Sequence, residues 1–378
     1  MISVNSSIKR CGLIINPIAG MGGAVGLKGT DGTNILKQAI ERGAVPRAEN
    51  RALQTLHMLR DMRGRIELVS GPGPMGQQAA VKAGFSPKVI GSLQAGTTTP
   101  ADTINIARTM AANDTDIILF AGGDGTARDI YAGIGSTQPC IGIPAGVKIH
   151  SAVFARNPVL AGEIASLFLK SRIRRCMEAE VIDLDEESYR KEILQTRLFG
   201  YLSVPAGKNR LQRSKTRSAG TDARAFEAIA HDLAESMDDR ICYVVGAGTT
   251  LRPLMQLLSL DFSLLGVDII QGRTLLAKDA PEKKILETIS GKEFRILVTP
   301  VGGQGYVFGR GNLQLSPDIL NTAGKQNIVI AAAPGKLQSL RGRPMLVDTG
   351  DRDTDTRLSG IYRVITGYHQ STMYRVQC

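Results

Sequence analysis

The residues best suited to chemistry in this chain lie at 121–130, AGGDGTARDI. The apolar residues 117–120 precede them, which predicts a buried strand that ends in a glycine turn. Glycine lets backbone N–H groups approach an anionic ligand closely, because it adds no Cβ and tolerates positive φ. A carboxylate in this turn, Asp124, would repel a phosphate, but it suits metal binding or removal of a proton from a substrate hydroxyl. The turn therefore points to phosphoryl transfer.

Similar turns follow other predicted strands in the first part of the chain, with the sequences NPIAGMGG, GPGPMG and AGTTTPAD. Segments with helical character separate these strands, and this alternation predicts a parallel doubly wound sheet. Ligands bind beyond the carboxyl ends of the strands in such a sheet, so we expect the turns to gather at one edge. The predicted strands span residues 11–16, 66–70, 88–93, 116–120 and 140–144.

The second part of the chain has a different pattern. Residues 178–185 and 198–206 alternate like antiparallel strands, and short apolar strands recur towards the C-terminus. We therefore expect an α/β plus β-rich fold with two domains. The first is an α/β nucleotide-binding domain over residues 1–155, with a doubly wound parallel sheet. The second is a mostly β domain over residues 156–378, with a small α/β excursion near 241–290.

Composition limits the classes of partner. The 378 residues are 43% hydrophobic and 21% charged, so the chain can bury a core. The net charge of +11 suits an anionic partner, but only 4% of residues are aromatic and tryptophan is absent, which argues against nucleic acid. A basic cluster at 208–217 is either a solvated loop or a mobile loop that meets substrate phosphates. Its cations are Lys208, Arg210, Arg213, Lys215 and Arg217.

Cysteine usage and hydropathy indicate the cellular setting. The five cysteines are scattered without a CxxC pair and the chain has four histidines, so we expect neither a disulfide framework nor a structural zinc site. The N-terminal apolar stretch is too short for a signal peptide, and no run approaches the roughly 20 apolar residues of a membrane helix. We expect a cytoplasmic homo-oligomer that binds a small molecule and has neither nucleic acid nor membrane as a partner.

With these motifs in order, the chain resembles the ATP-NAD kinase superfamily. GGDGT is the signature turn of the NAD, diacylglycerol and sphingosine kinases. The wider set resembles the branch of predicted ATP-NAD kinases that includes the AcoX-like proteins, and it covers nearly the whole chain. The matching motifs are NPxAGxGG at 16–23, TTxxDT at 98–103, GxGTT at 246–250, LLGVD at 264–268, GQGxxFGRGN at 303–312 and DTGD at 348–351.

The resemblance implies a kinase that uses ATP or polyphosphate with Mg²⁺ or another divalent cation. NAD is the implied acceptor, and Asp124 is the implied base that takes the proton from its 2′-hydroxyl. Catalysis would come mainly from positioning and charge neutralisation. The residues expected to bind nucleotide or phosphate are Asn16, Gly20, Gly22, Gly23, Gly71, Thr98, Thr99, Asp102, Gly122, Gly123, Gly125, Thr126, Gly146, Lys148, Ser151, Gly248, Thr249 and Arg310.

One departure from the family pattern leaves the acceptor open. The Asn-Glu pair that follows GGDGT in NAD kinases has no clear counterpart here, and IGIPAGVKIHSAVFA stands at 141–155. Lys148 and Ser151 of this segment are expected to contact phosphate. The alternatives are a kinase of the same fold for another hydroxylated metabolite, or a nucleotide sensor without catalysis. Lipid kinase activity is disfavoured, because no amphipathic, aromatic-rich surface is evident.

Structural roles are the alternative for several of these residues. Asp124 alternatively caps the helix that follows it, and Asn16 with its glycines forms a plain turn. Thr98, Thr99 and Asp102 suit a helix cap as well as a ligand contact. The remaining alternatives are a solvated or supporting Asp129, a structural or surface His150, turn roles for Arg310 and Asn312, and turn or metal roles for Asp348 and Asp351.

Overall fold

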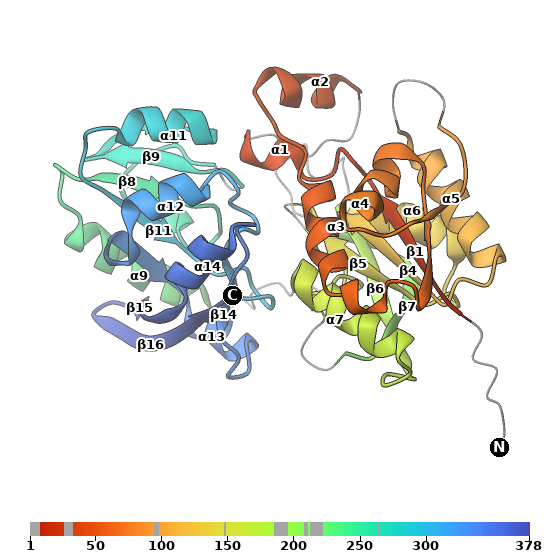
Figure 1. Ribbon diagram of the computed structural model, residues 1–378. Coiled ribbons are helices and arrows are strands. Elements are labelled where there is room, and N and C mark those ends of the chain that lie inside the picture. The colour runs from red at the N-terminus through yellow and green to blue at the C-terminus, as the bar shows by residue number, and fades with distance from the viewer. Residues whose placement is uncertain are drawn as a thin grey trace. The chain divides into compact units, whose positions relative to one another are not determined.

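The chain folds into two compact units, each built from two segments. The first unit comprises Met1–Gly20 and Val45–Ser214, and the second comprises Met21–Ala44 and Lys215–Cys378 (Figure 1). The computed structural model describes residues 8–25, 33–93, 98–146, 149–184, 196–207, 211, 222–263 and 265–378.

A five-stranded parallel sheet forms the centre of the first unit. Its strand order is β3-β2-β1-β4-β5, so the chain builds outward on one side of β1 and then on the other. The order reverses between β1 and β4, and such a reversal opens a crevice at the carboxyl ends of the strands. The strands are β1 (Lys9–Ile15), β2 (Ile66–Ser70), β3 (Lys88–Val89), β4 (Ile117–Gly122) and β5 (Cys140–Pro144).

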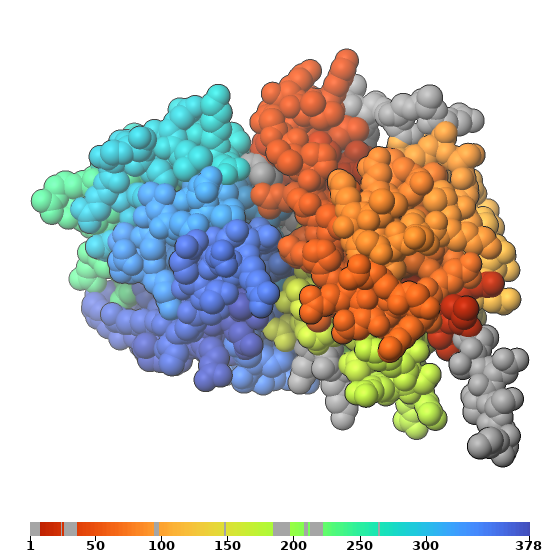
Figure 2. Space-filling view, in the orientation of Figure 1, coloured from red at the N-terminus to blue at the C-terminus, as the bar shows by residue number. Residues whose placement is uncertain are grey.

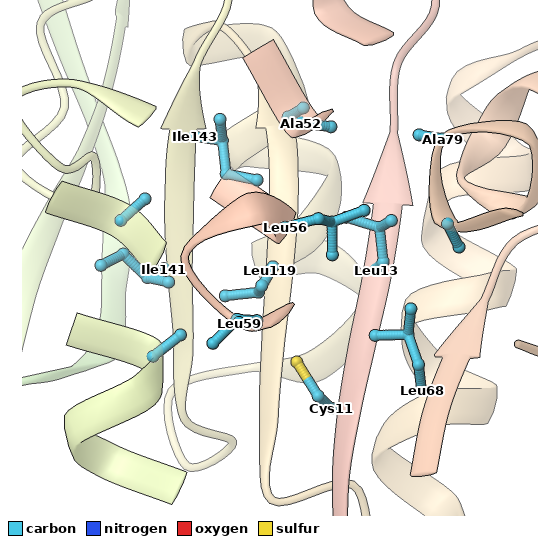
Figure 3. Close-up of a cluster of buried hydrophobic side chains, with 14 of the residues drawn as sticks. Cys11, Leu13, Ala52, Leu56, Leu59, Leu68, Ala79, Leu119, Ile141 and Ile143 are labelled. Carbon is cyan, nitrogen blue, oxygen red and sulfur yellow. The ribbon is translucent and has the colours of Figure 1, made fainter. Parts of the chain in front are cut away.

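Helices cover both faces of this sheet because its strands are apolar on both sides. Leu13, Leu119 and Ile141 come from three neighbouring strands and pack with Leu56 of α3 in one buried cluster (Figure 3). Ile14 belongs to the cluster on the other face. Orange side chains of the α3 and α4 region form the near surface of this unit in Figure 2. The helices are α3 (Ala48–His57), α4 (Gln77–Lys82) and α7 (Pro158–Leu169) in the first cluster, and α5 (Pro100–Ala112) and α6 (Asp124–Ile134) in the second.

An antiparallel pair, β6 (Cys176–Leu184) and β7 (Thr196–Pro205), completes the first unit. Val181 and Leu202 of these strands join the buried cluster formed with α5 and α6, and α7 packs on α3. Residues 156–214 therefore lie in the first compact unit. The division between the units differs from the domain boundary expected after residue 155, because these strands fill the core on the α6 side of the sheet.

The second unit contains a nine-stranded sheet in the order β10-β9-β8-β11-β13-β15-β16-β14-β12. The neighbours β8, β11, β13 and β15 are parallel, whereas β9 is antiparallel to β8 and β16 is antiparallel to β15. The strands are β8 (Cys242–Val245), β9 (Asp268–Gln271), β10 (Thr274–Ala277), β11 (Phe294–Val298), β12 (Tyr306–Phe308), β13 (Ile328–Ala331), β14 (Met345–Val347), β15 (Gly360–Gly367) and β16 (Gln370–Gln377).

The helices of the second unit cover both faces of its sheet. Val244 packs with α11 and α12 on one face, and Tyr243 packs with α9 and α10 on the other. The predicted fold class, a parallel α/β part followed by a strand-rich part, is confirmed. No helix in the described part of the chain has the length and apolar character needed to cross a membrane. The helices of the second unit are α1 (Met21–Ala24), α2 (Thr33–Glu41), α9 (Ala223–Ser236), α10 (Arg252–Leu257), α11 (Glu282–Ile289), α12 (Pro317–Ala323), α13 (Pro334–Ser339) and α14 (Arg352–Leu358). Short 3₁₀ turns lie at Arg60–Met62 and Gly73–Met75 in the first unit and at Lys325–Asn327 in the second.

The five thiols provide a test of this fold. Cys11, Cys140 and Cys242 are buried, whereas Cys176 and Cys378 are exposed. Burial raises the pKa of Cys11 to about 12, so this thiol stays protonated and unreactive at mildly alkaline pH. We expect a thiol reagent to modify the two exposed cysteines of the native protein rapidly and all five after denaturation. Rapid modification of Cys11 in the native protein, located by peptide mass spectrometry, would contradict the packing of β1.

Candidate active site

The glycine turns after β1 and β4 lie side by side at the carboxyl edge of the first sheet. Ile15 of β1 pairs with Ala121 of β4, and the Asn16 N–H donates a hydrogen bond to the Ala121 carbonyl at 2.9 Å. The strand order reverses between these two strands, which is where doubly wound sheets bind ligands. The candidate site of the first unit is therefore centred on Asn16 and residues 122–126.

A side-chain hydrogen bond joins these two turns. Asn16 Nδ2 donates to Thr126 Oγ1 over 3.0 Å, and Asn16 Oδ1 accepts a hydrogen bond from the Ile18 N–H at 3.3 Å. Thr126 is buried in the first turn of α6. Two residues predicted to bind nucleotide are thus brought together, and their side chains hold the turns in register.

Glycines let the turns after β1, β4 and β5 pack backbone against backbone. The Gly122 carbonyl accepts hydrogen bonds from the N–H groups of Ala145 at 2.9 Å and Gly146 at 3.1 Å. Gly20 has a φ of +79°, and a Cβ there would overlap the Ala145 carbonyl oxygen. A Cβ on Gly146 would lie 3.0 Å from the Gly123 Cα. The close approach expected of these glycines therefore occurs between the turns themselves.

Asp124 is the first residue of α6, and its carboxylate fastens the turn after β5 to this helix. Oδ2 accepts a hydrogen bond from the His150 N–H at 2.6 Å and lies 3.0 Å from His150 Nδ1. Oδ1 accepts hydrogen bonds from the N–H of Ser151 at 3.0 Å and from its hydroxyl at 2.6 Å. Gly123 occupies the N-cap position, so Asp124 does not cap α6 with its side chain. The positive end of the helix still favours a carboxylate there.

The residues after β5 differ from expectation in what they contact. Ser151, predicted to contact phosphate, is fully buried, and its Oγ accepts a hydrogen bond from the Ile182 N–H at 3.0 Å besides bonding Asp124. His150, expected to be a structural or surface residue, is also buried and lies within hydrogen-bond distance of Asp124. The succession of the predicted strands 116–120 and 140–144 was the available signal, because sequential strands often lie next to each other in a sheet. Lys148 and the basic cluster at 208–217, apart from Leu211, lie outside the described residues.

Thr99 and Asp102 form the capping box of α5. The Thr99 N–H donates to Asp102 Oδ2 at 2.7 Å, and the Asp102 N–H donates to Thr99 Oγ1 at 3.4 Å. Thr98 immediately precedes this cap. Gly71 follows β2, and its N–H donates to the Leu13 carbonyl at 3.2 Å. These contacts are those of a helix start and a turn, so the ligand roles of Thr98, Thr99, Asp102 and Gly71 stay predictions.

In the second unit, the turn after β8 carries the predicted residues Gly248 and Thr249. Gly248 has a φ of +135°, and a Cβ there would lie 2.6 Å from Thr299 Cγ2. Thr249 is exposed, whereas its neighbour Thr250 is buried. The buried Lys336 donates from Nζ to Thr250 Oγ1 at 2.8 Å and to Thr299 Oγ1 at 2.9 Å. Sequence analysis missed this lysine, although the three side chains follow the adjacent parallel strands β8, β11 and β13.

Arg310, a predicted phosphate ligand, lies in a buried polar group of the second unit. Its guanidinium carbon stacks 4.5 Å from the centre of the Tyr306 ring, and Nη2 lies 3.7 Å from Asp348 Oδ2. Asp351 caps α14 by accepting a hydrogen bond from the Thr354 N–H at 2.7 Å. Hydrogen bonds from Thr354 lower the pKa of Asp351. Asp351 thus has a structural role as the cap of α14.

Two further residues predicted to bind nucleotide, Gly22 and Gly23, belong to this unit as well. Both are buried in the short helix α1.

Family models match both parts of the chain. The model of the ATP-NAD kinase N-terminal domain matches residues 11–173, and that of the ATP-NAD kinase C-terminal domain matches residues 238–376. The chain belongs to the ATP-NAD kinase family. None of the curated proteins compared with it matches. The protein is therefore an ATP-dependent kinase of this family, a phosphotransferase with small-molecule substrates.

The family domains contain the residues described above. The N-terminal match covers the turns from Asn16 to Ser151, and the C-terminal match covers Gly248, Thr249 and Arg310. The likeness to the AcoX-like branch rests on the motifs alone. Family membership therefore supports the kinase chemistry at GGDGT, whereas the roles of the individual residues stay predictions.

A divalent cation would find no ready-made protein site among the described residues. Within the described ranges, no group of three His, Cys, Asp or Glu side chains could hold a metal ion. Both oxygens of Asp124 are occupied by hydrogen bonds from His150 and Ser151. A divalent cation held mostly by phosphate oxygens and water would be compatible with these residues.

Substituting Gly20 tests the backbone packing of the turns, with Gly43 as a matched control. Gly43 has a similar φ of +81°, but a Cβ there meets nothing within 4 Å. We expect Gly43→Ala to cost about 1–2 kcal/mol from backbone strain alone. Gly20→Ala should cost roughly 1–3 kcal/mol more, because the turn must move away from Ala145. It should also weaken ATP binding.

Urea unfolding and ATP titration of both variants provide the measurement. Equal losses of stability in Gly20→Ala and Gly43→Ala, with unchanged ATP affinity, would show that the turn after β1 does not pack on Ala145 in solution.

Proposed function

We propose that this kinase transfers the γ-phosphoryl group of ATP to the 2′-hydroxyl of NAD and so forms NADP. Family membership of both domains supports the ATP-dependent kinase chemistry. The position of Asp124 carries the assignment of the reacting centre. Its buried carboxylate lies at the start of α6, beside glycine turns, where the strand order of the sheet reverses.

The proposed reaction needs proton removal, phosphate binding and charge neutralisation. The 2′-oxygen forms a bond to the γ-phosphorus while the bond from that phosphorus to the β,γ-bridging oxygen breaks, and ADP leaves. The hydroxyl proton is withdrawn at the Asp124 centre. The turns around Gly20 and Gly123 would supply backbone N–H groups for phosphates. Mg²⁺ or another divalent cation, bound mainly with the donor phosphates, would supply the charge neutralisation.

The remaining sequence expectations stay predictions. Polyphosphate as a donor in place of ATP, a cytoplasmic location and homo-oligomeric assembly belong to this group. Donor choice is decided by offering ATP or polyphosphate with the same acceptor and comparing product formation.

A second acceptor class is favoured by one sequence feature. The segment after β5 reads PAGVKIHS, and it lacks the Asn-Glu pair expected for an NAD-binding kinase. A kinase of the same fold for another hydroxylated metabolite fits this feature. Incubation with ATP, Mg²⁺ and NAD, followed by ³¹P NMR, tests the first proposal, because NADP gives a 2′-phosphate resonance. Acceptor panels with labelled ATP test the second, and ATP binding without transfer to any acceptor would favour a sensor.

Replacing Asp124 tests its place in the reaction. We expect Asp124→Asn to lower turnover by about 10²–10⁴-fold, because the amide cannot stabilise a positive charge or hold a proton as the carboxylate does. ATP binding should largely survive. The variant should also lose about 1–3 kcal/mol of stability, since an NH₂ group now faces donors from His150 or Ser151.

Asp116→Asn is the matched control, because Asp116 precedes β4 at the opposite edge of the sheet and pairs with Lys9 at 2.7 Å. Turnover of this variant should match the wild type. Wild-type turnover in Asp124→Asn would remove Asp124 from the mechanism.

A further inference from the structure

The Asp124 carboxylate has little capacity left for a substrate hydroxyl. An ionised carboxylate offers about four lone-pair positions for hydrogen bonds. His150 supplies its N–H and Nδ1 to Oδ2, and Ser151 supplies its N–H and hydroxyl to Oδ1. The Asp124 side chain is 4% exposed. Direct uptake of a proton from a substrate would therefore require Asp124 to give up one of these donors.

The same contacts fix the protonation pattern of His150. A carboxylate oxygen only accepts hydrogen bonds, so the Nδ1 that lies 3.0 Å from Asp124 Oδ2 carries a hydrogen. In a neutral imidazole, Nε2 is then the atom with a lone pair that can take a proton. Among the residues that the structure describes, no hydrogen-bond partner occupies Nε2 of His150. The basic nitrogen of this pair thus lies on the histidine.

His150 also has the right place in the fold for this task. It lies on the segment after β5, and it reaches the first residue of the helix after β4. The adjacent Gly123 and Gly146 approach each other closely at the carboxyl edge of the sheet. Its side chain is 6% exposed, so bulk water competes little for the ring. The ring is therefore held by Asp124 at the edge where the phosphates are expected.

We propose that His150 Nε2 is the general base of the phosphoryl transfer and that Asp124 is its orienting partner. The inference rests on the proposed function. The acceptor O–H bond breaks, its proton moves to Nε2, and the oxygen forms the bond to the γ-phosphorus while ADP leaves. Asp124 stabilises the resulting imidazolium through Nδ1–H. The proton passes to solvent after the products leave.

Two substitutions of His150 distinguish a general base from a residue that only holds Asp124 in place. In His150→Asn, the side-chain amide still donates to Asp124 Oδ2 from the position of Nδ1, but the basic Nε2 is gone. We expect the thermal midpoint and the ATP dissociation constant to stay near wild type while kcat falls by about 10²–10⁴-fold. In His150→Ala, we expect added imidazole to restore part of kcat. A purely structural histidine gives the opposite result, with near-wild-type kcat in His150→Asn, and that result would overturn the proposal.

His57→Asn is the control, because His57 is an exposed histidine at the end of α3. Its kcat should equal that of the wild type. A loss of kcat in His150→Asn that comes with unfolding or lost ATP binding would assign His150 to the scaffold and count against the base role.

The tautomer of His150 provides a readout that needs no turnover. The chain has four histidines, so long-range ¹H–¹⁵N spectra of histidine-labelled protein, assigned by substitution, resolve each ring. We expect His150 to carry its hydrogen on Nδ1 and to leave Nε2 unprotonated. A hydrogen on Nε2 in the neutral ring would overturn the proposal. Absence of NADP formation by the wild type would instead refute NAD as the acceptor, and the variants are then compared with the acceptor found in the panel.

Discussion

The hydrogen-bonded carboxylate of Asp124 is the interaction on which the candidate site of the first unit depends. Burial of an ionised group is costly unless donors replace the lost water. Here two consecutive residues, His150 and Ser151, provide all four donors. Because Asp124 begins the helix after β4 and its donors follow β5, the carboxylate locks two loop segments of the sheet edge together.

The two units use buried charge in opposite ways. In the first unit the buried carboxylate of Asp124 accepts a hydrogen bond from the Ser151 hydroxyl. The Ser151 Oγ in turn accepts a hydrogen bond from the Ile182 N–H of β6. In the second unit the cation of Lys336 donates to the hydroxyls of Thr250 and Thr299, which follow neighbouring parallel strands. Each arrangement joins loops at the carboxyl edge of parallel strands by side-chain hydrogen bonds.

The sequence predicted the features that local pattern determines. Apolar runs followed by glycine turns located the strands of the first sheet, and GGDGT with the motif order predicted the family, which is confirmed. Contacts between distant segments could not be predicted in this way. The pairing of Asp124 with His150 spans 26 residues, and the burial of Lys336 depends on the order of three strands. The alternation of residues 178–185 and 198–206 indicated antiparallel strands, but it carried no information that they pack with α6.

The discontinuity of the two units has a consequence for synthesis of the protein on the ribosome. Residues 21–44 belong with a unit whose other residues begin at Lys215, so this segment emerges long before its packing partners. β1 is likewise made before its sheet neighbour β4, and more than a hundred residues are translated between the two strands. Early exposed strands invite non-native association. The second unit therefore cannot complete its packing until the residues from Lys215 onward have been made.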